Sequence, residues 1–166
     1  MTTKTWPNSG LTWEWLAISA RTAIAGVVSL LLARLLKMPE AYWAPITAMV
    51  IMQSTLGAAL KVSGQRFAGT ALGAVAGALL TKYFGSSVIA FTLGVFALGL
   101  LSAVLRIDRS AYRFAGITVA IVMLVQHATG PWVVAFHRFV EVSVGLLTGL
   151  LITAVWPERD SQAPSK

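Results

Sequence analysis

Long apolar runs dominate the chain, and each is close to the length of a membrane crossing. A spanning helix needs about 20 mostly apolar residues, with a range of about 17 to 25. Short polar segments separate the runs, and Trp or Tyr residues stand beside most of these segments, as is typical of membrane interfaces. The pattern predicts six transmembrane helices. They would cover residues 15–36, 43–60, 64–83, 87–105, 111–129 and 136–156.

The second and fifth runs are the least regular. Pro45 and Gln53 interrupt the second run, and Gln126 lies near the end of the fifth. Polar groups at membrane depth face protein or a water-filled cavity, because lipid cannot satisfy their hydrogen bonds. We therefore expect Gln53, Gln126 and Thr47 either to line a polar pathway or to hydrogen-bond neighbouring helices. The sequence leaves both roles open.

Composition places the chain in a membrane. Of its 166 residues, 57% are hydrophobic and 11% are charged, whereas soluble domains average about 45–50% and about 25%. Cysteine is absent, which excludes disulfides and thiolate metal sites. The net charge of +7 is scattered between apolar runs and forms no basic stripe, so we expect no nucleic-acid binding. Phosphate-loop, nucleophile-elbow and two-histidine zinc motifs are missing, so we expect neither an enzyme nor a cofactor.

The distribution of Lys and Arg predicts the topology. Residues 15–157 form one transmembrane domain, preceded by a segment at 1–14 and followed by a disordered polar tail at 158–166. With the N-terminus inside, eight Lys and Arg residues lie on the inner side and four on the outer side, with Arg21 left out of the count. Positive residues favour the cytoplasmic side. We therefore expect both termini in the cytoplasm.

Two stretches repeat one pattern: residues 66–80, RFAGTALGAVAGALL, and residues 138–152, RFVEVSVGLLTGLLI. Both begin with Arg-Phe and place Gly at the eighth and twelfth positions. The segments ITAMVIMQSTLG from Ile46 and ITVAIVMLVQHATG from Ile117 also resemble each other. We therefore divide the chain into two three-helix units.

The two units, about 15–83 and about 87–157, would each cross the membrane three times. An odd number of crossings reverses orientation, so the copies would be inverted repeats, as in many transporters. Chance similarity between apolar helices is the alternative, because RFAG occurs again at Arg113. The predicted fold is an all-α polytopic membrane protein of two inverted three-helix repeats.

Five glycines recur at four-residue spacing on the third and sixth helices. They are Gly69, Gly73, Gly77, Gly145 and Gly149. This spacing puts them on one face of each helix, where missing side chains allow close approach of another backbone. We interpret them as helix-packing residues, with a partner in this chain or in a second copy.

Three arginines lie within or beside apolar runs, where a charge costs about 2.5–3.5 kcal/mol on insertion scales. Arg21 either extends to the inner interface or contacts an anion. Arg66 and Arg138 are expected at helix starts, one near each membrane face, where the helix dipole disfavours a cation and calls for an anion. A guanidinium can hold a carboxylate through two hydrogen bonds. A permeating anion and a lipid phosphate remain equal alternatives.

His137 and Glu141 are four residues apart, on one helix face. Glu141 takes the position that Gly69 holds in the first repeat. A buried carboxylate beside a histidine can relay protons, whereas the simpler expectation is that Glu141 neutralises Arg138 or His137. The pair has too few neighbouring ligands for a metal site.

The segments at 42–80 and 137–157 resemble the fusaric-acid-resistance and aromatic-acid-exporter superfamily of inner-membrane proteins. The resemblance covers about residues 15–157. The positions that carry it are Tyr42-Trp43-Ala44, Gln53, Arg66, Gly69-Thr70, Gly73, Arg138, Gly145 and Trp156-Pro157.

The resemblance implies efflux of organic anions, often aromatic carboxylates, through a six-helix domain in the bacterial inner membrane. Larger members add a cytoplasmic domain, and some carry two membrane halves. This chain corresponds to one half, so we expect it to work as a homo-oligomer among membrane lipids. Two alternatives remain: a non-transporting membrane subunit that packs beside a partner, and a lipid-binding scaffold.

Overall fold

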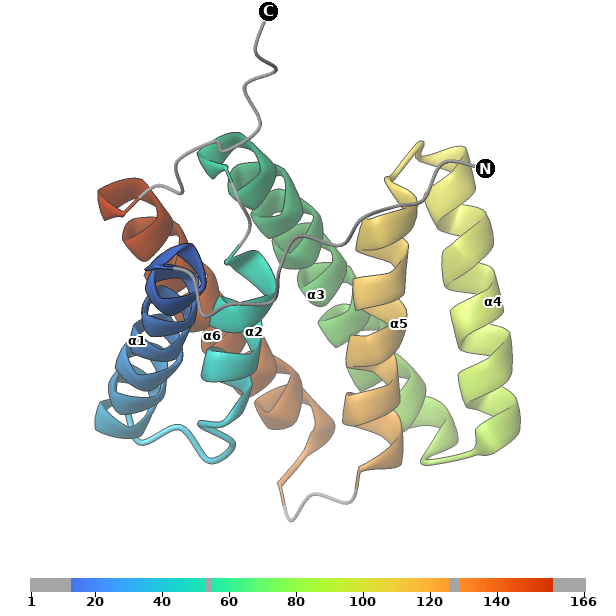
Figure 1. Cartoon of the computed structure of the whole chain (residues 1–166). Coiled ribbons are helices and arrows are strands. Elements are labelled where there is room, and N and C mark those ends of the chain that lie inside the picture. Colours follow the sequence, from blue (N-terminus) through green and yellow to red (C-terminus); the bar gives the residue numbers. More distant parts are fainter. Residues whose placement is uncertain (1–12, 53–54, 126–128, 157–166) are drawn as a thin grey trace, which may run out of the picture.

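All regular structure in the described part of the chain is helical (Figure 1). The computed structural model describes residues 13–52, 55–125 and 129–156. Its elements, in chain order, are α1 (Trp13–Leu35), α2 (Trp43–Ile51), α3 (Leu56–Phe84), α4 (Val88–Val104), α5 (Arg109–Leu124) and α6 (Pro131–Val155).

Three of these helices are long and apolar enough to cross a membrane: they lie over Trp15–Leu35, Leu56–Phe84 and Pro131–Val155. The apolar helix α4 has 17 residues. In contrast, α2 has nine residues and a length of about 14 Å at 1.5 Å per residue, about half of the hydrocarbon core. The structure therefore supports an all-helical membrane protein with three candidate spans in its described residues.

The predicted second helix, 43–60, is wrong as a single element. The helix α2 ends at Ile51, and α3 begins at Leu56, eight residues before the predicted start at 64. Thr55 accounts for the new start, because its side-chain oxygen accepts a hydrogen bond from the N–H of Ala58 at 3.2 Å and caps α3. The sixth helix also begins early, at Pro131, where proline is favoured as a first helical residue.

The helix α3 crosses the middle of the molecule and packs along both α5 and α6 (Figure 1). On one side, α6 packs against α2, and α1 covers both of them. On the other side, α4 packs against α5. Arg66 and Arg138 therefore lie where α2, α3, α5 and α6 approach one another.

The glycine faces lie against neighbouring helices. A Cβ at Gly73 of α3 would meet the carbonyl of Ala115 and lie 2.8 Å from the Cβ of Thr118 on α5. A Cβ at Gly145 of α6 would meet the carbonyl of Ala44 on α2. No side chain fits in either place without moving a backbone, so these glycines set the separation of both helix pairs.

Candidate functional site

Four charged side chains gather around the start of α2. Arg66 comes from α3, Arg138 and Glu141 come from α6, and Glu40 lies in the turn before α2. Arg66 is 8% exposed, Arg138 is 4% exposed and Glu141 is fully buried. Buried charges require partners, so the contacts of each group decide what the cluster can do.

Arg138 is surrounded by two carboxylates and an aromatic ring. Its Nη1 lies 3.6 Å from Oε2 of Glu40 and 3.5 Å from Oε2 of Glu141. Its guanidinium carbon lies 3.7 Å from the ring centroid of Trp43, which is within the range of a cation–π contact. The charge of Arg138 is thus met within the protein.

The two glutamates are themselves held by α2 and the turn before it. Oε1 of Glu141 accepts a hydrogen bond from the backbone N–H of Glu40 at 3.0 Å. The indole N–H of Trp43 donates to Oε2 of Glu40 at 3.0 Å. These hydrogen bonds, together with the ion pairs of Arg138, join α6 to the start of α2. The simpler expectation for Glu141, a countercharge to Arg138, agrees with this geometry.

Arg66 has different surroundings. Its Nη2 donates to Oγ1 of Thr47 at 3.0 Å, and its guanidinium carbon lies 4.9 Å from the ring centroid of Phe114. Within the described residues, no carboxylate forms an ion pair with Arg66, and its Nε has no hydrogen-bond partner. A buried guanidinium therefore meets a hydroxyl and an aromatic ring but no countercharge in that part of the chain.

The two arginines lie close together, which corrects the expected placement at opposite membrane faces. Arg66 contacts Thr47, and Arg138 contacts Trp43, one helical turn earlier on α2. One turn is about 5.4 Å. Both arginines are also well inside their helices, ten residues after Leu56 and seven after Pro131. The expected position at helix starts is wrong, and the dipole argument, which applies to the first turn, no longer holds.

The other predicted site residues are dispersed. Gln53 and Gln126 lie outside the described residues. His137 is half-buried, with its ring 6.2 Å from that of Phe136, and in the described part of the chain no hydrogen bond or ion pair joins it to Glu141. The structure thus brings Arg66, Arg138, Glu141 and Thr47 together and leaves His137 beside them.

Arg21 lies apart from this cluster, at the end of α6. It is 3% exposed, and its Nη1 donates to the backbone carbonyl of Trp156 at 3.0 Å. The last carbonyls of a helix lack intrahelical partners, and a cation near them is favourable. In this conformation Arg21 closes the end of α6 against α1.

We expect Arg21→Met to lower the free energy of unfolding by about 1.5 kcal/mol, the value for loss of one charge-assisted hydrogen bond. Thermal unfolding in detergent measures this loss, and hydrogen exchange should increase in the last turn of α6. Arg34→Met, at an exposed position at the end of α1, is the matched control. Unchanged stability with a loss of anion flux would favour the anion-contact role instead.

Sequence reasoning missed three residues of the cluster: Glu40, Trp43 and Phe114. Trp43 was assigned to the interfacial belt and to the family resemblance. The repeat could have indicated both aromatic residues, because the alignment of Ile46 with Ile117 places Trp43 opposite Phe114. Glu40 gave no such signal, since its counterpart at 111 is Ala.

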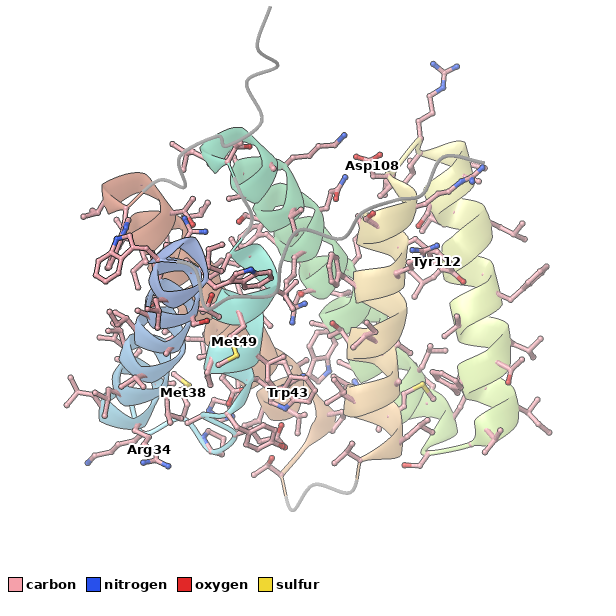
Figure 2. All side chains as sticks on the ribbon, in the orientation of Figure 1. Arg34, Met38, Trp43, Met49, Asp108 and Tyr112 are labelled. Carbon is pink, nitrogen blue, oxygen red and sulfur yellow. The ribbon has the colours of Figure 1, made fainter. Side chains whose placement is uncertain are left out.

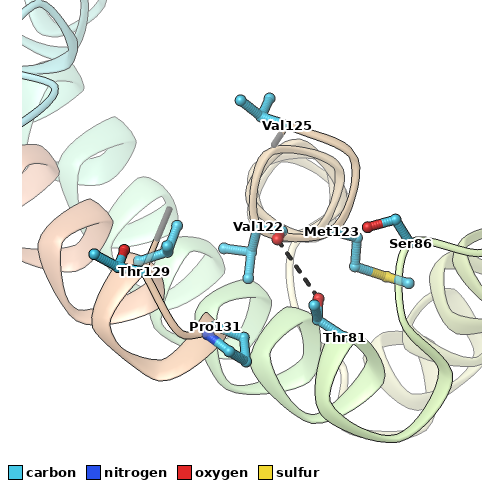
Figure 3. Close-up of a pocket in the computed structure, with 8 residues that line it drawn as sticks. Thr81, Ser86, Val122, Met123, Val125, Thr129 and Pro131 are labelled. Carbon is cyan, nitrogen blue, oxygen red and sulfur yellow. Dashed lines mark hydrogen bonds between the residues drawn. The ribbon is translucent and has the colours of Figure 1, made fainter. Parts of the chain in front are cut away.

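Two cavities in the described part of the chain lie away from the charged cluster. One of about 330 Å³ lies between the ends of α3 and α5 and the start of α6, with Thr81, Val122 and Pro131 among its lining residues (Figure 3). A second, of about 570 Å³, lies at the turn between α4 and α5, with Asp108 and Tyr112 among its lining residues; Asp108 lies at the opposite end of the molecule from Arg34 (Figure 2). Neither cavity is lined by Glu40, Arg66, Arg138 or Glu141.

Known proteins resemble the chain over most of its length. Residues 25–152 match the family described as fusaric acid resistance protein-like. The inner membrane protein YeeA of Escherichia coli is 29% identical over 141 residues, which cover 84% of this chain and 40% of YeeA. The uncharacterized transporter YdhK of Escherichia coli is 30% identical over an alignment of 172 positions, covering 95% of this chain and 26% of YdhK. No solved structure matches the chain.

The chain thus spans less than half the length of the curated relatives that it matches. The relatives and the apolar helices support an inner-membrane protein, and the family is transporter-like rather than enzymatic. The match extends from the middle of α1 nearly to the end of α6, and it includes the charged cluster. The chain belongs to the fusaric acid resistance protein-like family.

Proposed function

We propose that this chain forms a pathway for small organic carboxylates across the inner membrane and that Arg66 meets the anion. The observation that carries the proposal is the environment of Arg66: a buried guanidinium with a hydroxyl and a ring beside it but no carboxylate partner among the described residues. The transporter-like family is consistent with this role.

The chemistry of Arg66 suits a carboxylate. A guanidinium presents its N–H groups in a planar fork that matches two carboxylate oxygens. Placing a charge at membrane depth costs about 2.5–3.5 kcal/mol on insertion scales, and such residues commonly mark substrate or ion pathways. The ring of Phe114 and the nearby Trp43 add apolar surface that suits an aromatic acid.

Equivalent contacts in the two halves support inverted repeats. Arg66 and Arg138 are equivalent positions, 72 residues apart, and Trp43 and Phe114 are equivalent positions, 71 residues apart. Arg66 contacts the ring of Phe114, and Arg138 contacts the ring of Trp43. The glycine contacts correspond in the same way, as Gly73 meets the carbonyl of Ala115 and Gly145 meets that of Ala44. We propose that the pathway passes between the two units, near the pseudo-two-fold axis.

Apolar surface on the outer helices bears on assembly. Large apolar side chains are exposed on α1 and α4, including Leu31 at 58% and Ile89 at 73%. We therefore propose a homo-oligomer surrounded by lipid, with both termini in the cytoplasm. Glu141 and His137 remain candidates for proton coupling.

We expect Arg66→Gln to reduce benzoate flux in proteoliposomes at least tenfold, because the neutral amide offers the anion no charge. Arg66→Lys keeps the charge but loses the planar fork, so an intermediate flux is expected. Arg34→Gln removes an exposed arginine of α1 and should leave flux unchanged.

All four proteins are compared at equal reconstituted amounts and oligomer size. Equal flux in wild type and Arg66→Gln would contradict the role of Arg66. If the folded wild type carries no carboxylate, with or without a pH gradient, the transport proposal is wrong and the subunit alternative gains support.

A further inference from the structure

The two arginines differ because the repeat differs at one position. Arg138 is followed three residues later by Glu141, and Arg66 is followed three residues later by Gly69. Glu141 reaches Arg138 and the N–H of Glu40. At Gly69, a Cβ would instead meet the carbonyl of Ala111, so the close contact of α3 with α5 leaves no room for a side chain there. One arginine thus has an internal carboxylate, and its counterpart has none at the equivalent place.

From this asymmetry we propose that Glu141 is a tethered competitor: its carboxylate occupies a binding site for carboxylates at Arg138, and a permeating organic acid displaces it. The inference rests on the proposed function and specifies how the second arginine takes part in it. The ligand class is a monocarboxylate, the same chemical group that Glu141 itself provides.

The contacts around Glu141 describe such a site. One oxygen accepts from the backbone N–H of Glu40, and the other faces the guanidinium of Arg138, which contacts the ring of Trp43. A backbone donor, a guanidinium and an aromatic wall are the elements that recognise an aromatic carboxylate. A side chain that already supplies this carboxylate prevents a free anion from binding in the same place.

The contact between Glu141 and Arg138 is weak, as expected of a carboxylate that a ligand displaces. Its Oε2 lies 3.5 Å from Nη1 of Arg138, and neither atom has a hydrogen-bond partner among the described residues. A strong guanidinium–carboxylate bond is shorter, about 2.7–2.9 Å. Nε of Arg138 is likewise buried without a partner. A free carboxylate can approach the guanidinium in the two-bonded geometry that the tethered one does not reach here.

Arg66 lies close enough to Arg138 for an anion to pass from one arginine to the other once Glu141 is displaced. Thr47, its partner, lies one turn from Trp43 on α2. An anion that leaves Arg66 therefore finds the second guanidinium beside a residue one helical turn earlier on α2. Competition by Glu141 keeps the second site from retaining the anion, since conduction requires sites that bind weakly enough to release.

The test measures equilibrium binding of radiolabelled benzoate to the purified full chain in detergent. Glu141→Gln keeps an acceptor for the N–H of Glu40 but removes the competing charge, so we expect the dissociation constant to fall about tenfold, as when the binding-competent fraction rises tenfold. Asp108→Asn makes the same chemical change at an exposed carboxylate, which is held by Gln65 at 2.8 Å, and should change nothing. Equal or weaker binding in Glu141→Gln would overturn the proposal.

A second variant tests the site without relying on transport. Glu141→Ala removes the tethered carboxylate, and acetate should then raise the unfolding temperature of this variant more than chloride does at the same ionic strength. Wild type should show a smaller difference, because Glu141 fills the site at Arg138 and leaves only Arg66 to bind acetate. An equal effect of acetate and chloride on the variant would contradict a carboxylate site at Arg138.

The two proposals fail in different ways. If wild type carries no carboxylate but acetate stabilises Glu141→Ala more than it stabilises wild type, the transport function is wrong and the site at Arg138 stands. If wild type transports benzoate while Glu141→Gln binds no tighter and acetate has no specific effect, the competitor role alone is wrong.

Discussion

Arg138→Gln should lower the free energy of unfolding by about 3–5 kcal/mol, the usual cost of removing one partner from a buried ion pair. Glu141 is fully buried and Glu40 has a side chain only 19% exposed, and both approach Nη1 of Arg138. Without the guanidinium, both carboxylates lose the cation that they approach in common. Like charges in that environment repel strongly, because water does not screen them.

The double variant Arg138→Gln with Glu141→Gln separates this charge effect from a loss of packing. Replacing both members of a buried pair costs much less than replacing one, so the double variant should recover a large part of the lost stability. The glutamine at 138 retains some contact with the ring of Trp43. Denaturant unfolding in detergent gives the free energies of wild type, the two single variants and the double variant, which together form a double-mutant cycle.

A coupling energy near zero in that cycle would show that Arg138 and Glu141 do not interact in the folded protein. The proposed competitor role of Glu141 would then lose its structural basis. A coupling of 0.5–3 kcal/mol is typical of residues in contact.

The sequence predicted the helical class, the membrane environment and the family, because all three depend on features that a single chain displays directly. Apolar runs between Ser87 and Leu105 coincide with α4 to within a residue at each end. The break after Ile51 was harder to predict, since residues 43–60 are apolar on both sides of it. Thr55 supplies the cap that restarts the helix, but a single threonine is a weak signal within an apolar run.

The cluster was predicted only in part, for a reason of packing. Arg66, Arg138 and Glu141 attract notice because charges are rare in apolar segments. Their mutual proximity depends on the crossing of α3, α6 and α2, which no spacing along one helix reveals. Glu40 was overlooked because it lies in a short polar connection, where a carboxylate is ordinary.

The glycine pair provides the second large stability effect: Gly73→Ala combined with Gly145→Ala should cost about 2–6 kcal/mol. Overpacking by one methyl group in a tight contact costs about 1–3 kcal/mol. Each Cβ would meet a backbone carbonyl, of Ala115 in one case and of Ala44 in the other. A backbone atom cannot rotate away as a flexible side chain can, so a whole helix must move.

The two single variants test the equivalence of the helix pairs. Gly73 separates α3 from α5 and Gly145 separates α6 from α2, so we expect losses of similar size that add when combined, because the contacted residues are different. Gly64→Ala is the matched control on α3: nothing lies within 4 Å of its Cβ position, and alanine there should stabilise the helix by about 0.5–1 kcal/mol. If Gly73→Ala behaved like Gly64→Ala, α3 and α5 would not pack through this face in the membrane. A large loss at Gly73 with none at Gly145 would instead show that α6 and α2 do not pack through the face on which Gly145 meets the carbonyl of Ala44.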